Sequence, residues 1–444
     1  MERLLASGLR AAAVERKAEL FDRAFLLLKR WGEAHASGET RLYVPGRIEV
    51  LGKHTDYAGG RSLLCALERG LCVVANRRPS DQFVHIADAV SGQVCQFALS
   101  SELDAASQDW SVYPRTVARR VARNFAGSLH GANIVFASDL ARSAGLSSSS
   151  ALIVATFLAL REINDLTRDP AYQSNIGTNQ DLATYLGCVE NGQSFLGLAG
   201  HSGVGTFGGS EDHTAILCCR VDRLSQFRFC PARFEQEVPL PPGCIFVIGV
   251  SGVVADKTGS ARAKYNQASL AAKTILAIWN EGSGRSDPTL FDAATSSPDA
   301  ANRIRELLRN SSESFYPRGT LLGRFEQFFN ENICNIPGAV NALARNELEE
   351  FGVWVDRSQA DAEQHLGNQV PETAELARSA RALGAIAASA FGAGFGGSVW
   401  AMVQSNMAPD FLNRWKEHYH QRFPARAESS EFFVSAAGAP AVLF

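Results

Sequence analysis

The chain has 444 residues, of which 46% are hydrophobic and 20% are charged, and its formal net charge at pH 7 is -3. This composition is typical of a globular protein with a large buried interior, and it excludes a disordered or fibrous chain. The small net charge provides no broad basic field, so nucleic acid and anionic membranes are not expected partners. No uncharged apolar run reaches the roughly 18 residues that a membrane span requires.

The length favours two domains over one hydrophobic core. The expected boundary is the polar, proline-bearing segment 235–243, which gives a first domain at 1–240 and a second at 241–444. The nine cysteines are scattered without a CxxC spacing, and the first residues lack the pattern of a secretion signal. We therefore expect a reduced, cytoplasmic protein that is a monomer or a weak homo-oligomer.

Periodicity predicts elements of both kinds along the chain. Helical spacing of apolar residues predicts helices at 4–34, 110–125, 265–280, 325–351 and 373–383. Runs rich in β-branched and aromatic residues predict strands at 41–52, 71–76, 82–88, 93–99, 244–252, 385–391 and 398–404. The mixture predicts the α+β class with two lobes.

The segment GLSSSS at 145–150 places a glycine and four serines directly before an apolar run with helical spacing. Backbone amides at a helix N-terminus lack intrahelical partners and favour anions, so this start is a candidate polyphosphate site. Serines that merely cap a buried helix are the alternative interpretation. One capping serine would suffice, and four in a row favour the phosphate site.

This segment resembles the second motif of the GHMP kinases, PxGxGLSSSA, with Ala141, Ser143 and Ala144 where that family has proline and glycines. The resemblance implies an ATP site, and it implies that Ser149 binds Mg²⁺. The ATP-binding residues that it implies are Gly145, Leu146, Ser147, Ser148 and Ser149.

The segment VPGRIEVLGKHTDYAGG at 44–60 resembles the signature PGRVNLIGEHTDYNGG of the galactokinase branch of that family. Arg47 is a fixed cation suited to a transferring phosphoryl group, and His54 and Asp56 offer hydrogen bonds to sugar hydroxyls. Without the resemblance, a solvated polar turn is the plainer interpretation. Glu49 stands where galactokinases have asparagine.

Lys53 replaces the glutamate that binds the far end of galactose in that branch. An ammonium group only donates hydrogen bonds and attracts anions. A uronic acid such as galacturonate is therefore a hypothesis beside galactose, with Lys53 as a substrate-binding residue.

The segment 189–217 resembles the galactokinase stretch that runs from a metal-binding glutamate to the aspartate of GIMDQ, with GSEDH in its place. The resemblance assigns Glu190 to Mg²⁺ and Asp212 to catalysis, where an aspartate orients the attacking hydroxyl and accepts its proton. Glu211 is the alternative base, and an exposed turn at 210–213 is the alternative without chemistry. The resemblance also assigns Gly209 and Tyr265 to the sugar.

Two literal GxGxxG patterns occur, at 203–208 and 392–397. A dinucleotide fingerprint needs a strand before it and a helix after it. The first follows a predicted helix and precedes an apparent strand, and the second lies between predicted strands, so a dehydrogenase is not expected. The segment 392–403 instead resembles the third GHMP motif, whose glycines allow the backbone to approach the phosphate loop closely.

With three motifs in order across 40–405, the chain is identified by resemblance as a GHMP kinase of the galactokinase branch. The resemblance implies a two-domain α+β fold with mixed sheets and an active site between the domains. It also implies transfer of phosphate from ATP to the anomeric hydroxyl of galactose, with a uronic acid or arabinose as alternatives. A catalytically inactive sugar-sensing regulatory protein is the alternative outside the enzyme class.

Overall fold

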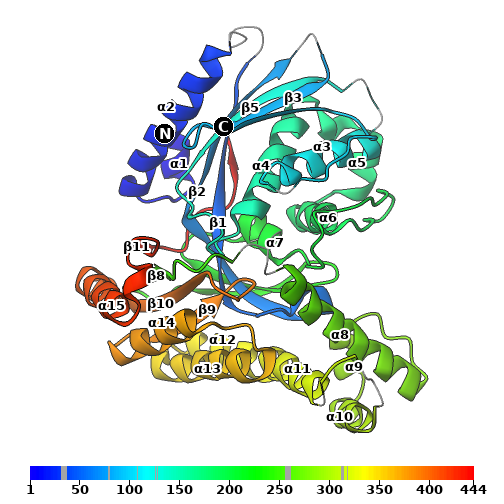
Figure 1. The fold of residues 1–444 in the computed structure, drawn as a ribbon, viewed down its shortest axis with the longest axis vertical. Helices are drawn as coiled ribbons and strands as arrows, with labels where there is room; N and C mark the ends of the chain where they lie inside the picture. The colour runs from blue at the N-terminus through cyan, green and yellow to red at the C-terminus, as the bar shows by residue number, and fades with distance from the viewer. Residues whose placement is uncertain are drawn as a thin grey trace.

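The computed structural model describes residues 1–31, 38–78, 81–107, 109–125, 127, 129–255, 262–311, 315–317 and 319–444. Two β-sheets organise the chain, and helices cover them (Figure 1). Within the described residues, no helix is long and apolar enough to cross a membrane.

The first sheet has eight strands in the order β12-β1-β2-β5-β3-β4, with β6 paired to β2 and β7 to β6. Its β3–β5 pair is parallel and its other pairs are antiparallel, so the sheet is mixed. The strands are β1 (Thr40–Leu51), β2 (Arg61–Arg78), β3 (Phe83–Asp88), β4 (Val94–Ala98), β5 (Gly131–Ser138), β6 (Arg223–Arg228), β7 (Arg233–Pro239) and β12 (Val442–Leu443).

The second sheet has four antiparallel strands in the order β11-β8-β10-β9. They are β8 (Cys244–Val250), β9 (Ala387–Phe391), β10 (Ser398–Gln404) and β11 (Glu431–Ser435). The seven strands predicted from 41–52 to 398–404 are all present, whereas β5, β6, β7, β11 and β12 were not predicted. The apparent strand after 203–208 is instead a helix.

The helices of the first half flank the first sheet, with α2 on one face and α3 to α6 on the other (Figure 1). They are α1 (Glu2–Ala6), α2 (Ala11–Arg30), α3 (Val112–Asn124), α4 (Ser148–Ile163), α5 (Pro170–Asn175), α6 (Asn179–Asn191) and α7 (Glu211–Cys218). Those of the second half are α8 (Arg262–Ser283), α9 (Leu290–Ala294), α10 (Ala300–Asn310), α11 (Thr320–Phe329), α12 (Ile336–Ala344), α13 (Leu348–Asp361), α14 (Pro371–Ala382) and α15 (Ala408–Arg422).

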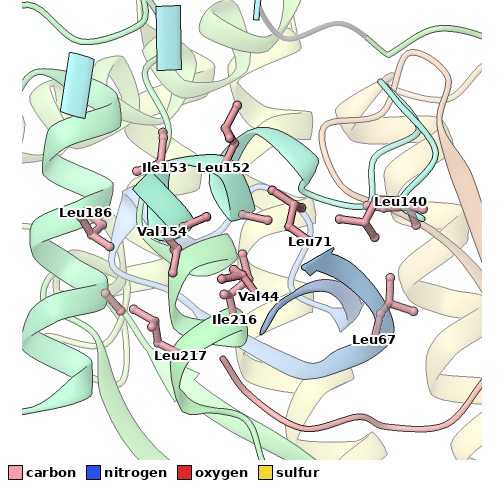
Figure 2. Close-up of a cluster of buried hydrophobic side chains, with 14 of the residues drawn as sticks. Val44, Leu67, Leu71, Leu140, Leu152, Ile153, Val154, Leu186, Ile216 and Leu217 are labelled. Atoms are coloured by element: carbon pink, nitrogen blue, oxygen red, sulfur yellow. The ribbon is translucent and has the colours of Figure 1, made fainter. Parts of the chain in front are cut away.

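Helix α4 is apolar on nearly all sides, which is the pattern of a helix buried in the middle of a large protein. It packs on β1 and β2, and α7 lies against it (Figure 2). Each of its buried leucine, isoleucine and valine side chains contributes about 1.5–3 kcal/mol to folding. This packing fixes the helix N-terminus beside the middle of β1.

The two sheets share one hydrophobic cluster, because Leu42 of β1 belongs to the same core as Phe246 of β8 and Trp400 of β10. The second sheet begins four residues after the expected boundary at 240/241. The chain end, however, returns to the first sheet, where β12 pairs with β1. The two-domain division stays a prediction, and the last residues pack with the first half.

Candidate active site

Arg47 lies in β1, where the pairing register with β2 shifts beside it, as at a β-bulge that redirects side chains. Its guanidinium is buried, and it donates from Nη1 to the carbonyl oxygen of Gly145 at 2.6 Å. It also donates from Nε to Oδ1 of Asp212 at 2.8 Å. One side chain therefore joins the loop before α4 to the start of α7.

The loop 145–149 has the backbone geometry of a phosphate cradle. Gly145 and Ser147 both adopt positive φ angles, of 72° and 62°, and α4 begins at Ser148. The Ser147 hydroxyl is buried and has no hydrogen-bond partner among the described residues. An unsatisfied hydroxyl and the free amides of a helix N-terminus together suit an anion.

A first cavity of about 320 Å³ opens on this loop. Trp110, Tyr113 and Phe136 line one part of it, and Ser147, Ser148 and Ser149 line another. The size is within the usual range for small-molecule sites. Aromatic walls suit a nucleobase and the serine loop suits phosphates.

A second cavity lies on the other side of Arg47, which is the one described residue that borders both. Here Ser150, and not the expected Ser149, lies beside the acidic groups: its hydroxyl is 3.0 Å from Oε2 of Glu190 and 3.2 Å from Oδ2 of Asp212. Successive helix residues point about 100° apart. Ser149 therefore lines the first cavity, whereas the Ser150 hydroxyl points to Glu190 and Asp212, which line the second.

The segment after 203–208 is helix α7, so the strand expected there was wrong. The exposed turn is also wrong, because Glu211 and Asp212 are both buried. At the N-terminus of this helix both carboxyl groups reach the second cavity. The glycine pattern at 203–208 is still not a dinucleotide fingerprint, because it follows helix α6 and not a strand.

Glu211 accepts a hydrogen bond from the Ser62 hydroxyl at 2.6 Å. Burial raises its pKa well above the ordinary value, and the neighbouring Glu49 and Asp56 carboxylates raise it further. Burial likewise raises the pKa of Glu49 to about 7. The raised pKa of Glu211 and its hydrogen bond to Ser62 make it a weaker candidate for the base than Asp212, which contacts Arg47.

The sugar residues that the resemblance implies gather around the second cavity. Asp56 accepts a hydrogen bond from the Glu211 amide at 3.1 Å, and Gly209 packs against its carboxylate. His54 bonds through Nε2 to the carbonyl oxygen of Ala393 at 3.0 Å, and its ring lies 5.2 Å from that of Tyr265. Of the residues expected to bind substrate, these four all line the cavity.

Lys53 points elsewhere. Its ammonium group is buried against the second half of the chain, where it donates to Ser389 at 2.7 Å and to Ser358 at 3.2 Å. Lys53 does not belong to the described residues that line the second cavity. The sequence shows that Lys53 replaces a glutamate of the galactokinase branch. It does not show the direction of this side chain, which follows the end of β1.

The third motif approaches the phosphate loop backbone to backbone, as expected from its glycines. A Cβ on Gly392 would lie 3.1 Å from the Gly145 carbonyl oxygen. The Ser398 hydroxyl donates to the Ala144 carbonyl at 2.6 Å, and the Gly392 amide donates to Glu49 at 3.2 Å. The loop 392–397 lies between β9 and β10, so it is no dinucleotide fingerprint either.

In this conformation the second cavity has about 30 Å³ of space. That volume holds about two water molecules, so a sugar must displace some of the lining groups when it binds. The roles of the individual residues stay predictions, whereas their gathering at one place is a property of the structure.

Three family models match the chain: the galactokinase galactose-binding signature at 34–77, the GHMP kinases N terminal domain at 113–190 and the GHMP kinases C terminal domain at 339–421. The chain is 27% identical to the galactokinase of Roseiflexus sp. (strain RS-1), across 85% of this chain and 86% of that one. It is 25% identical to a galactokinase of Haemophilus influenzae, across 82% and 85% of the two chains.

The fold is similar to that of Lactococcus lactis galactokinase complexed with galactose, with a TM-score of 0.75 at 20% identity, across 94% of this chain and 98% of that one. The mevalonate kinase of L. major shows a weaker likeness, with a TM-score of 0.53 at 14% identity, across 91% of this chain and 97% of that one. With the motifs, the fold and both cavities in agreement, the chain belongs to the GHMP kinase family as a galactokinase-like, ATP-dependent sugar kinase.

Proposed function

We propose that this kinase transfers the γ-phosphate of ATP to the anomeric hydroxyl of galactose or of a closely related sugar. The observation that carries the proposal is the place of Arg47, which borders both cavities and contacts both Gly145 and Asp212. A phosphoryl group that passes from one cavity to the other must pass this cation. Phosphoryl transfer depends mainly on such positioning and charge stabilisation.

In this proposal Asp212 orients the sugar hydroxyl and accepts its proton, while Arg47 stabilises negative charge on the phosphoryl oxygens. The loop 145–149, with Leu146 and Ser148 contributing through the helix start, holds the phosphates of ATP. His54, Asp56, Gly209 and Tyr265 hold the sugar.

Mg²⁺ fits the same site. The ion is usually held by one or two carboxylates together with substrate phosphates, and Glu190 provides a carboxylate beside the serine loop. Ser149, on the side of the first cavity, or Ser150, beside Glu190, completes the protein ligands. Bound there, the ion would neutralise charge on the phosphates.

Galactose and arabinose remain the leading substrates, and galacturonate loses its main support because Lys53 points away from the sugar cavity. A sugar-sensing protein without catalysis is not favoured, because Arg47, Glu190 and Asp212 keep mutual positions that suit transfer. All nine cysteines are free, which agrees with the proposed cytoplasmic location.

The test is ADP release by the purified chain with MgATP and galactose. Asp212→Asn should abolish turnover and leave ATP binding intact, whereas Asp410→Asn, on the exposed face of α15, should behave as the parent. Turnover retained by Asp212→Asn would show that another residue is the base. Binding of both ligands without ADP release in the parent would favour the sensor.

A further inference from the structure

The imidazole of His213 is a buried polar group to which the proposed function gives no role. His213 follows Asp212 in α7, is 1% exposed and belongs to the lining of the second cavity. Neither of its ring nitrogens makes a hydrogen bond with any described residue. Buried polar side chains nearly always have such a partner, and one without it indicates a water molecule, an ion or a ligand. His213 is also a departure of this chain, because the GIMDQ motif of the galactokinase branch has glutamine at this position.

The ring of His213 approaches the carboxylate that would hold the divalent ion. Its Nε2 atom lies 3.2 Å from Oε2 of Glu190, and the Ser150 hydroxyl oxygen lies 3.0 Å from the same carboxylate oxygen. Nitrogen and oxygen ligands lie roughly 2.0–2.2 Å from a divalent ion, so two ligands at a right angle are about 3 Å apart. The spacing of these three atoms therefore matches that of neighbouring ligands of one ion.

An ion pair between His213 and Glu190 is the plainer explanation of the short distance. It accounts for only part of the geometry. The contact between Nε2 and Oε2 does not have the alignment of a hydrogen bond, and Nδ1 has no hydrogen-bond partner among the described residues. A charged pair buried in this way is stable only when its remaining polar atoms are also satisfied.

An ion at this place needs ligands beyond the protein. Among the residues that the structure describes, no three histidine, cysteine, aspartate or glutamate side chains form a group that could hold a metal ion. His213 and Glu190 would therefore bind an ion that brings further ligands with it. In the proposed function these are the phosphates of ATP, with which a kinase commonly shares its divalent ion.

We propose that His213 is, together with Glu190, a ligand of the divalent ion that accompanies ATP, and that its nitrogen gives the site a preference for transition-metal ions over Mg²⁺. This inference rests on the proposed kinase function and names the class of ion at that same site. Mg²⁺ takes oxygen ligands, whereas imidazole suits first-row transition ions, whose affinity rises from Mn²⁺ to Co²⁺. Glutamine at this position would offer an amide oxygen in place of the nitrogen.

The direct test is spectroscopic and needs no turnover. The parent chain is prepared with ¹⁵N-labelled histidine and loaded with Mn²⁺ and the ATP analogue that has a methylene bridge between its β- and γ-phosphates. Pulsed electron paramagnetic resonance should show coupling between Mn²⁺ and ¹⁵N, which only a histidine can supply. His213→Gln should abolish the coupling, whereas His420→Gln, on α15 outside both cavities, should keep it.

Absence of the coupling in the parent chain, or its survival in His213→Gln, would overturn the proposal. The partner of His213 would then be a water molecule or the Glu190 carboxylate alone. Because the first of these results comes from the parent chain, it does not depend on the folding of any variant.

Calorimetry tests the preference between ions. It gives the dissociation constants of Co²⁺ and of Mg²⁺ from the complex of each protein with the same ATP analogue. The preference for Co²⁺ over Mg²⁺ should be about tenfold or more weaker in His213→Gln than in the parent chain, and His420→Gln should keep the parent value. The preference of the nucleotide itself is common to all three proteins and cancels. Equal preferences in the three proteins would contradict the proposal.

These measurements separate failure of this inference from failure of the proposed function, because neither uses a sugar. If galactose is phosphorylated with MgATP and no histidine coupling appears, the kinase proposal stands and this inference fails. If the coupling to His213 appears and no sugar is phosphorylated, the kinase proposal fails and His213 is still a ligand of the ion.

Discussion

Gly209 faces the Asp56 carboxylate so closely that a Cβ there would lie 2.4 Å from Asp56 Oδ2. A Cβ atom does not tolerate that distance, so Gly209→Ala should displace the Asp56 carboxylate within the second cavity, where we propose that it holds the sugar. We expect the KM for sugar to rise roughly tenfold or more while the affinity for ATP is kept. Gly177→Ala is the matched control, because its nearest neighbouring atom is 3.7 Å from the added Cβ.

Glu49 makes stability depend on pH. Its folded-state pKa of about 7 lies above the ordinary 4.5, so the folded chain holds a proton that the unfolded chain releases. This stabilisation is complete below about pH 4.5 and is lost as the pH rises through about 7, a change of up to about 3 kcal/mol.

Glu49→Gln cannot ionise, so its free energy of unfolding should fall less between about pH 5 and about pH 8 than that of the parent. Urea unfolding of both proteins at the two pH values measures this difference. Parallel curves for the two proteins would show that Glu49 does not hold the proton.

Motifs predicted which residues gather here but not where each side chain points. Arg47, His54 and Asp56 could be predicted at the site because segment 44–60 closely resembles the galactokinase signature. A close sequence match of this kind indicates the same backbone path. Lys53 could not be placed in the same way, since the strand ends beside it and its partners, Ser358 and Ser389, are some three hundred positions later. Only the folded chain shows which neighbour the ammonium group meets.

The residue at which α4 begins determines which serine side chain points toward which cavity. The sequence alone does not show which of the four consecutive serines points to which cavity. The direction of each side chain depends on the residue at which the helix begins. The structure begins the helix at Ser148. Helix α7 was missed because eight residues with acidic groups at one end and apolar ones at the other also suit a turn and a strand.

Ser150→Ala removes the hydroxyl that lies between Glu190 and Asp212. We expect kcat to fall about tenfold or more, because two buried carboxylates lose their common donor, with little change in the KM for ATP. Ser149→Ala, on the side of the first cavity, should instead raise the KM for ATP. Steady-state kinetics over a range of MgATP distinguishes the two, and identical effects would argue against separate roles.

At the scale of the whole molecule, the last residues close the first sheet although they follow the second. The Phe444 amide donates to the carbonyl oxygen of Arg41 at 3.0 Å, and the Phe444 ring packs edge-on against that of Phe21. The Ala441 amide donates to the carbonyl oxygen of Ile216. A two-residue strand such as β12 is too short for any periodicity, so sequence could not reveal this return. The sequence predicted two lobes. It did not predict their shared hydrophobic core or the pairing of β12 with β1.

Deletion of residues 441–444 should therefore destabilise the whole chain and not only its end. Loss of the Phe444 packing and of the β12 pairing should cost about 2–3 kcal/mol. Thermal unfolding should show one transition shifted to lower temperature. An unchanged Tm would mean that β12 contributes nothing to the sheet.

The position of Arg47 between the cavities has a thermodynamic consequence. In the proposed function the Arg47 guanidinium lies between the phosphates of ATP in the first cavity and the sugar in the second, so the affinities for the two ligands should be linked. By reciprocity, the factor by which nucleotide alters the dissociation constant of the sugar must equal the factor by which sugar alters that of the nucleotide. Removing this one charge should bring both factors toward unity together, whichever sugar proves to be the natural one.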